Sequence, residues 1–177
     1  MSQRTELEKF RLVWDREAQE TLRVIESLPE GQYDFRPDPA GRSLGEMAWH
    51  LAEIEAYTSL GVAQKRMAFD VKPPNSERPR EVKLLAPGYR RLHDEAVERL
   101  DKLVDKDLDE MLTYFDGRGM SVRDILWEGL LHHQIHHRGQ LVLMCRLAGG
   151  SPPGLFGPNR EEMEAMKAAR AKEKARV

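Results

Sequence analysis

Histidine is the residue type with the clearest potential for chemistry in this chain. There are six histidines, and four of them lie in the run HHQIHH at positions 132–137. Residues four apart share one face of a helix, so His132 with His136, or His133 with His137, could chelate one divalent ion. Neutral imidazole is a common ligand for such ions. The run therefore predicts a metal site with two candidate pairs.

Helical periodicity favours the second pair. At about 100° per residue, a helix over residues 121–148 places six apolar side chains on one face, namely Val122, Leu126, Leu130, Leu141, Met144 and Leu147. His133 and His137 lie in the middle of this face, whereas His132 and His136 lie toward its edge, where we expect partial exposure. Each unpaired buried polar nitrogen costs on the order of 1–3 kcal/mol. A metal ion that satisfies both central imidazoles would remove that cost.

His50 is a third candidate ligand. It shares the core-facing stripe of an expected second helix with Met47, Ile54 and Tyr57, and bundles often build sites from facing helices. A single histidine on such a stripe is more often an ordinary core residue, so the prediction depends on its coincidence with the pair. Three protein ligands leave coordination positions open, as in catalytic sites. An all-imidazole set favours zinc or nickel, with iron, copper or manganese as alternatives.

Several neighbouring polar residues have two interpretations each. Glu46 and Glu53 lie one turn on either side of His50 and could orient its ring. Glu46 also completes a capping box, which we favour, and Glu53 could be plain surface charge. Gln140 flanks the ligand face and could reach the site or a substrate. His93 lies at the border of an apolar face, and a structural role is favoured for it.

Other residues of the last helix have expected structural roles. Arg138 points away from the ligand face and is expected to be structural or interfacial. Gly139 is expected to let a neighbouring helix approach, and Cys145 is expected to be a buried thiol. A second apolar stripe opposite the histidines indicates a central helix or a homodimer interface. That stripe contains Trp127, Leu131, Ile135 and Val142.

Four amphipathic helices must position these residues. Periodicity, caps and breakers predict them over residues 5–28, 43–69, 87–104 and 121–148. Ser43 with Glu46 forms a capping-box pattern at the start of the second helix. Residues 71–81 contain three prolines and cannot form a regular helix.

The expected fold is therefore an all-α four-helix bundle, occupying residues 1–160. Its connectors are longer than usual bundle loops and could carry one helix across the end of the bundle. Residues 161–177 alternate in charge and have little apolar face. We expect them to form a charged C-terminal tail, either a solvated helix or a frayed end.

Composition points to an ordinary soluble protein. The chain has 177 residues, 40% hydrophobic and 33% charged, with a formal net charge of −2. No global basic field predicts binding to nucleic acid or to an anionic membrane. The single cysteine excludes an intramolecular disulfide. The N-terminal residues lack a signal-peptide pattern, and no stretch approaches the roughly 18–20 apolar residues of a membrane span. We therefore expect a cytoplasmic protein.

The segments WHLAEIE around His50 and HHQIHHRGQL in the last helix resemble the DinB/YfiT-like metalloenzyme superfamily. The HRGQ tail is the most specific piece, and YDFRPDPAGRSLGEMAWH and SPPGLFGPNREE also fit, so the resemblance covers most of the chain. It implies a four-helix bundle whose three metal ligands correspond here to His50, His133 and His137. Members of this family commonly form homodimers. Some are transferases or isomerases that use bacillithiol, mycothiol or glutathione-like thiols, and many have no assigned activity.

These observations lead to one principal hypothesis and two alternatives. The principal hypothesis is a metal-dependent enzyme acting on a small molecule, either a thiol-dependent S-transferase or a hydrolase of a small ester or amide. The first alternative is a non-catalytic metal-binding or stress-response binding module. The second is a helical interaction protein whose histidines are core residues. No phosphate-binding glycine loop, serine-nucleophile elbow or nucleic-acid module occurs in the sequence.

Overall fold

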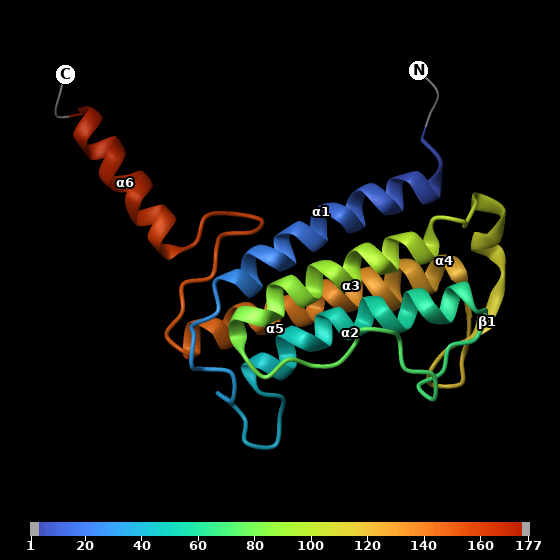
Figure 1. Cartoon of the computed structure of the whole chain (residues 1–177). Helices are drawn as coiled ribbons and strands as arrows, with labels where there is room; N and C mark the ends of the chain where they lie inside the picture. Colours follow the sequence, from blue (N-terminus) through green and yellow to red (C-terminus); the bar gives the residue numbers. More distant parts are fainter. Residues whose placement is uncertain (1–3, 175–177) are drawn as a thin grey trace.

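Four long helical stretches pack side by side in the computed structural model, which describes residues 4–174 (Figure 1). The first three are α1 (Glu6–Glu26), α2 (Leu44–Ala63) and α3 (Leu85–Leu100). The fourth is continuous and contains α4 (Val122–Asp124), the π-helical segment η3 (Ile125–His132) and α5 (His133–Leu147). The predicted all-α bundle is thereby confirmed.

The order of the helices around the bundle differs from a simple up-and-down arrangement. Helices α1 and α2 each pack chiefly against α3 and α5, so they occupy opposite corners. Figure 1 shows α2 and α3 running in the same direction, because the connector of residues 64–84 returns along the length of the bundle before α3 begins. The expectation that a long connector breaks the simple up-and-down order is confirmed, although this connector runs along the length of the bundle and not across its end.

Capping boxes start the first two helices at the predicted residues. Thr5 N–H donates to Glu8 Oε2 at 2.8 Å, and Glu8 N–H donates to Thr5 Oγ1 at 3.3 Å. In α2, Ser43 N–H donates to Glu46 Oε2 at 2.9 Å, and Glu46 N–H donates to Ser43 Oγ at 3.2 Å. Each box satisfies two backbone donors that have no partner inside the helix. The favoured interpretation of Glu46 as a capping residue is confirmed.

The predicted end of the second helix was wrong. Helix α2 ends at Ala63, not near residue 69. Lys65 adopts a left-handed conformation, with φ at 55°. Arg66 N–H then donates to Gly61 O at 2.8 Å and Lys65 N–H to Val62 O at 3.1 Å, the bonding pattern of a Schellman termination. A lysine at the position usually held by glycine gave no signal in the sequence.

The third helix and the connector after it also differ from the prediction. A 3-10 turn, η1 (Val82–Leu84), leads into α3, which begins at Leu85 and ends at Leu100 rather than spanning residues 87–104. Pro87 lies inside the first turn, where backbone N–H groups have no helical partner, so it is tolerated there.

A short hairpin was missed in the next connector. After η2 (Asp105–Asp109), strands β1 (Met111–Thr113) and β2 (Gly119–Ser121) pair in antiparallel register, with Leu112 opposite Met120. Gly117 supplies the positive φ, 87°, that the turn needs. Strands of three residues are too short to show alternation in the sequence.

The fourth helical stretch has the predicted extent but not the predicted geometry. The π-helical turns of η3 bond from residue i to residue i+5, so they are wider than α-helical turns. Even so, five of the six apolar residues predicted on the core face are buried, namely Val122, Leu126, Leu130, Leu141 and Met144. Leu147, predicted on the buried face, is 57% exposed.

The second apolar stripe packs at least partly against α1. The Trp127 and Phe10 rings meet edge to face with centroids 5.4 Å apart, and Trp127 Nε1 donates to Glu6 Oε1 at 3.3 Å. Leu131 is buried. The central-helix alternative accounts for these contacts, and the homodimer stays a prediction.

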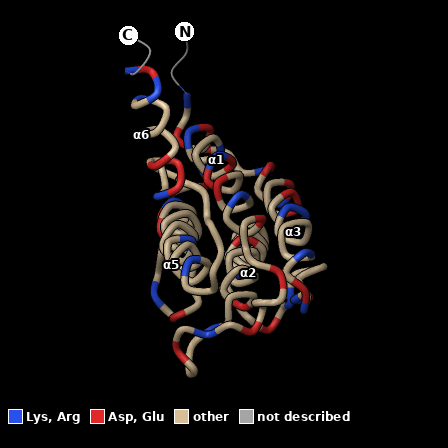
Figure 2. The backbone as a smooth tube through the Cα atoms, turned by 90° about the vertical axis from the view of Figure 1, so that its left-hand side faces the viewer, with Lys and Arg blue, Asp and Glu red and all other residues tan. Residues whose placement is uncertain are grey.

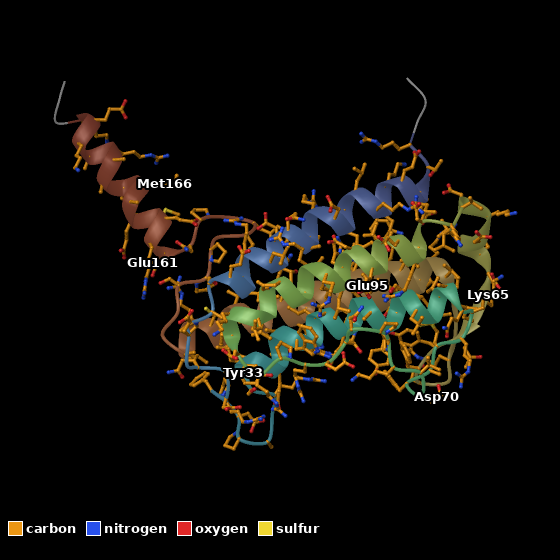
Figure 3. All side chains as sticks on the ribbon, in the orientation of Figure 1. Tyr33, Lys65, Asp70, Glu95, Glu161 and Met166 are labelled. Carbon is orange, nitrogen blue, oxygen red and sulfur yellow. The ribbon has the colours of Figure 1, made fainter. Side chains whose placement is uncertain are left out.

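Helix α6 (Arg160–Lys174) extends away from the bundle and is exposed along its length (Figures 1 and 3). Arg146 of α5 donates to Glu161 at 2.7 Å and 2.8 Å, which fixes the start of α6. Acidic and basic residues are interspersed along its backbone, as on α1 and α3 (Figure 2). The solvated-helix alternative describes residues 161–174, and residues 175–177 lie outside the described part. The division at residue 160 stays a prediction. Each helix between residues 4 and 174 is too short or too polar to cross a membrane.

We expect Glu46→Gln to lower stability by about 1 kcal/mol at pH 7. The hydrogen bonds and charge of Arg36, with the Ser43 N–H bond, lower the pKa of Glu46 to about 2 from an ordinary 4.5. Its ionised form therefore stabilises the fold fully above pH 4.5, and this contribution is lost as the pH falls toward about 2. Urea unfolding of both proteins from pH 2 to 7 should show a difference that shrinks on acidification. A constant difference would contradict this account.

Candidate metal centre

Three histidines from two facing helices converge at one side of the bundle. His50 lies on α2, and His133 and His137 lie on α5; one ring nitrogen from each lies within 4.8 Å of the others. The His133 and His137 Nε2 atoms are 2.9 Å apart, and the centroid of the His50 ring lies 4.7 Å from that of His137. All three side chains are partly buried. The structure thus brings together the three residues that periodicity selected.

The other HHQIHH pair lies outside this cluster. His132 and His136 are exposed. The His136 ring meets that of His137 edge to face at 4.9 Å, and His136 Nε2 lies 3.2 Å from Gln140 Nε2. The expectation of exposure for this pair is confirmed.

The π-helical segment ends at His133, where the backbone bonding differs from that of a regular helix. The backbone N–H of His133 donates to the carbonyls of Glu128 and Leu130 rather than to that of Gly129, its partner in a regular α-helix. The Gly129 carbonyl acts on the His133 ring, where it favours the protonated form and opposes the effect of burial on the pKa. This geometry could not be inferred from residue spacing.

Acceptors also lie beside the other two rings. His137 Nδ1 is 2.7 Å from Gln140 Oε1, so Nδ1–H donates to the amide oxygen and Nε2 keeps its lone pair. His50 Nδ1 lies 3.6 Å from Glu53 Oε2. Gln140 and Glu53 therefore contact the triad, whereas Glu46 pairs with Arg36 at 2.8 Å. The alternative in which Glu53 is plain surface charge does not account for its contact with His50.

The electrostatic environment favours neutral imidazoles. Burial lowers the pKa of His133, and the charges of His50, His136 and Arg42 lower it further. Burial likewise lowers the pKa of His137 to about 4, aided by the charges of His50 and His133, although the Gln140 bond opposes this shift. Two of the rings are therefore neutral at pH 7, as metal binding requires.

The residues that directly follow His133 and His137 are fixed in the core. Arg138 is 1% exposed; its Nη2 donates to Glu17 Oε2 at 2.5 Å and its Nη1 to the Glu17 carbonyl at 2.8 Å. Gln134 Nε2 donates to Tyr89 Oη at 2.8 Å and to the Glu55 carboxylate. These contacts set the rotation of α5 about its own axis. The structural role expected for Arg138 is confirmed, but the sequence analysis missed Gln134.

His93 belongs to this separate polar cluster, not to the triad. It is 4% exposed, and its Nδ1 lies 2.7 Å from Glu55 Oε2. Burial alone would lower the pKa of His93, but the bond and charge of Glu55 raise it overall. Tyr89 Oη donates to Glu55 Oε1 at 2.5 Å. A glutamate inside the apolar stretch of α2 was the signal that could have revealed this cluster.

Two further expectations for α5 have opposite outcomes. Cys145 is fully buried, as expected. Gly139 is exposed, and a Cβ atom built on it would meet nothing within 4 Å. The expected close approach of another helix at Gly139 was therefore wrong, because the helix packs through its other faces.

A cavity of about 460 Å³ opens beside the triad. His50 and His133 form part of its wall, together with several aromatic side chains. The volume lies within the range typical of small-molecule sites. A ligand in this cavity would lie directly beside the imidazoles.

Comparison with known proteins places these features in context. A sequence model of the DinB family matches residues 1–174. The chain is 29% identical over 158 residues to the uncharacterized protein YrdA of Bacillus subtilis, covering 88% of this chain and 91% of that protein. A DinB-like protein from Bacillus cereus has a similar structure, with a TM-score of 0.69 and 29% identity over 83% of this chain and 95% of that one. A DinB-like protein from Bacillus subtilis shares the fold, with a TM-score of 0.66 at 20% identity over 86% and 99% of the two chains.

We expect Arg138→Met to destabilise the fold by about 3 kcal/mol, because it leaves the Glu17 carboxylate buried without its main partner. This value is at the lower end for such pairs, since Arg16 still reaches Glu17 Oε1 at 2.9 Å. The double variant Glu17→Leu with Arg138→Met should recover much of the loss. Urea unfolding at pH 7 measures both, and a single variant as stable as the parent would refute the role of this pair.

We also expect the His137 ring of the metal-free protein to titrate near pH 4 instead of near 6.5. Because folding favours the neutral ring, its contribution to stability is complete above pH 6.5 and is lost as the pH falls through about 4. Two-dimensional NMR of histidine ring nitrogens during a pH titration of chelator-treated protein provides the measurement. A midpoint at 6.5 would show that the ring is solvated.

Proposed function

Because this chain belongs to the DinB family, and because its three inward-facing histidines converge, we propose that His50, His133 and His137 bind one divalent transition-metal ion. The observation that carries the proposal is the approach of three ring nitrogens to within 4.8 Å of one another. Zinc or nickel suits three imidazoles best, with iron or manganese as alternatives.

The donor set fits a metal ion by its hydrogen bonding as well as its spacing. Gln140 accepts from His137 Nδ1, so this ring would present Nε2 to the ion, with the tautomer fixed by its outer partner. The Glu53 carboxylate lies 3.6 Å from His50 Nδ1, within ion-pair distance. The lowered pKa values of His133 and His137 remove most competition from protons at neutral pH.

We further propose that the protein is a metal-dependent enzyme acting on a small molecule, either a thiol-dependent S-transferase or a hydrolase. A divalent ion in such a site supplies a Lewis acid that lowers the pKa of a bound thiol or water toward about 7. The chain's own residues orient the imidazoles and shape the adjoining cavity of about 460 Å³. The cavity favours an enzyme over a non-catalytic metal-binding module, which needs no space for a substrate.

Elemental analysis of gently purified, tag-free protein tests the metal site. We expect about one equivalent of a transition metal per chain, lost in His137→Ala. Glu53→Gln should weaken metal binding by about 10–100-fold, as expected when an outer partner is removed. His132→Ala is the matched control, because it removes an exposed histidine from the same run and should retain the metal.

Two results would contradict the proposal. One is equal metal content in His137→Ala and the parent protein. The other is no uptake by the parent after dialysis against zinc or nickel above the ordinary histidine pKa of about 6.5. If metal is bound, thiol-transfer and ester-hydrolysis assays of loaded protein, with His137→Ala as the blank, separate an enzyme from a binding module.

A further inference from the structure

The cavity beside the triad has two chemically different ends. Arg42 precedes the first residue of α2 by two positions, and the cavity follows α2 past His50 to Tyr57. At a rise of about 1.5 Å per residue, Arg42 and Tyr57 lie roughly 10 Å before and after His50 along the helix axis. One end therefore carries a cation, the middle adjoins the imidazoles, and the far end is aromatic.

Arg42 is an exposed cation without a partner in the described part of the chain. None of the ion pairs or side-chain hydrogen bonds within residues 4–174 involves it, whereas Arg36 of the same loop pairs with Glu46 at 2.8 Å. The acidic residue of the cavity wall, Glu53, faces His50 Nδ1 at 3.6 Å. The guanidinium fork of Arg42 is thus available to a carboxylate, whose geometry it matches with two parallel hydrogen bonds.

The aromatic end is built from segments outside the bundle. Phe69 follows α2 and Phe115 lies in the turn between β1 and β2; their rings stack with centroids 4.3 Å apart and an interplanar angle of 16°. Figure 1 shows these two connectors meeting at the same end of the molecule. Tyr57 meets Phe69 edge to face at 5.6 Å. Even so, Phe69 remains 68% exposed, so a large apolar surface stays uncovered at the cavity.

Gly129 helps to place a further aromatic residue in this wall. A Cβ atom on Gly129 would lie 2.9 Å from Tyr114 Oη, too close for an ordinary contact. The absence of a side chain thus lets Tyr114 approach the π-helical segment.

We propose that the substrate is an elongated small molecule with an aromatic ring at one end and a carboxylate at the other. Arg42 binds the carboxylate, and the stacked Phe69 and Phe115 rings bind the aromatic end. The part of the substrate that joins these two ends lies beside the triad. This proposal rests on the proposed function and specifies its substrate class. A ring packed on Phe69 would bury apolar surface that the chain leaves exposed, which favours binding.

Binding of 8-phenyloctanoate, whose extended chain can reach from the guanidinium of Arg42 to the aromatic wall, and of its neutral amide tests the two ends separately. Titration calorimetry with the full chain, both chelator-treated and zinc-loaded, should show that metal-free protein prefers the carboxylate. Arg42→Gln should weaken carboxylate binding about tenfold or more, as expected for a hydrogen-bonded charge, and should leave amide binding unchanged. Phe69→Ala should weaken both probes.

Matched controls keep the test specific. Arg90→Gln on α3 and Phe156→Ala, whose ring is 78% exposed, remove the same residue types outside the cavity and should change neither affinity. Equal affinity for the two probes, or no effect of Arg42→Gln, would refute the anionic end. A Phe69→Ala variant that behaves like Phe156→Ala would refute the aromatic end, and absence of binding at millimolar concentration would refute both.

The metal proposal can fail independently of this one. Metal content is measured by elemental analysis, whereas the Arg42 and Phe69 effects are measured on protein without metal. Probe binding without metal uptake would refute the metal site and leave the cavity assignment intact. Metal uptake with no probe binding would support the metal site and refute the cavity assignment.

Discussion

The rotation of α5 about its own axis is the constraint on which the site depends. His133 and His137 converge with His50 only if this helix presents one narrow face to α2. The next residue after each histidine is held on the other side: Gln134 by Tyr89 and Glu55, and Arg138 by Glu17. A turn of the helix that displaced either imidazole would also break a buried polar contact. The buried contacts of Gln134 and Arg138, on the other side of α5, therefore fix the geometry of the triad.

Such contacts are a costly way to organise a core. Removing Glu17 and Arg138 from water carries a desolvation cost that their attraction only partly offsets, and an apolar pair of similar volume would often be as stable. Apolar side chains, however, slide and rotate with little penalty, whereas a hydrogen-bonded pair has one acceptable geometry. The Glu55 cluster, which joins α2, α3 and α5 through Tyr89, His93 and Gln134, works in the same way. Its residues define relative helix positions more than they add stability.

Helical periodicity was sufficient to predict the bundle and the three converging histidines, because both follow from which residues share a helix face. It failed where the backbone departs from the regular α-helix. The Schellman end at Lys65 lacks the usual glycine, and residue spacing gave no sign of the π-helical segment or of the exposure of Leu147 at the last residue of α5. Glu55 and Gln134 were missed for another reason: hydropathy treats a polar residue on a buried face as an interruption. Their partners become evident only when three helices are placed together.

The return of the 64–84 connector along the bundle separates two tasks within one small fold. The imidazoles are supplied by helices whose spacing is set by the core, whereas Phe69 and Phe115 come from the connectors that flank those helices. Loops of this kind tolerate substitution and changes of length far better than packed helices do. On the substrate assignment proposed above, changes in these loops would alter which ligands the cavity accepts while the histidine triad stays unchanged. A constant triad beside a variable wall would let one scaffold bind different small molecules.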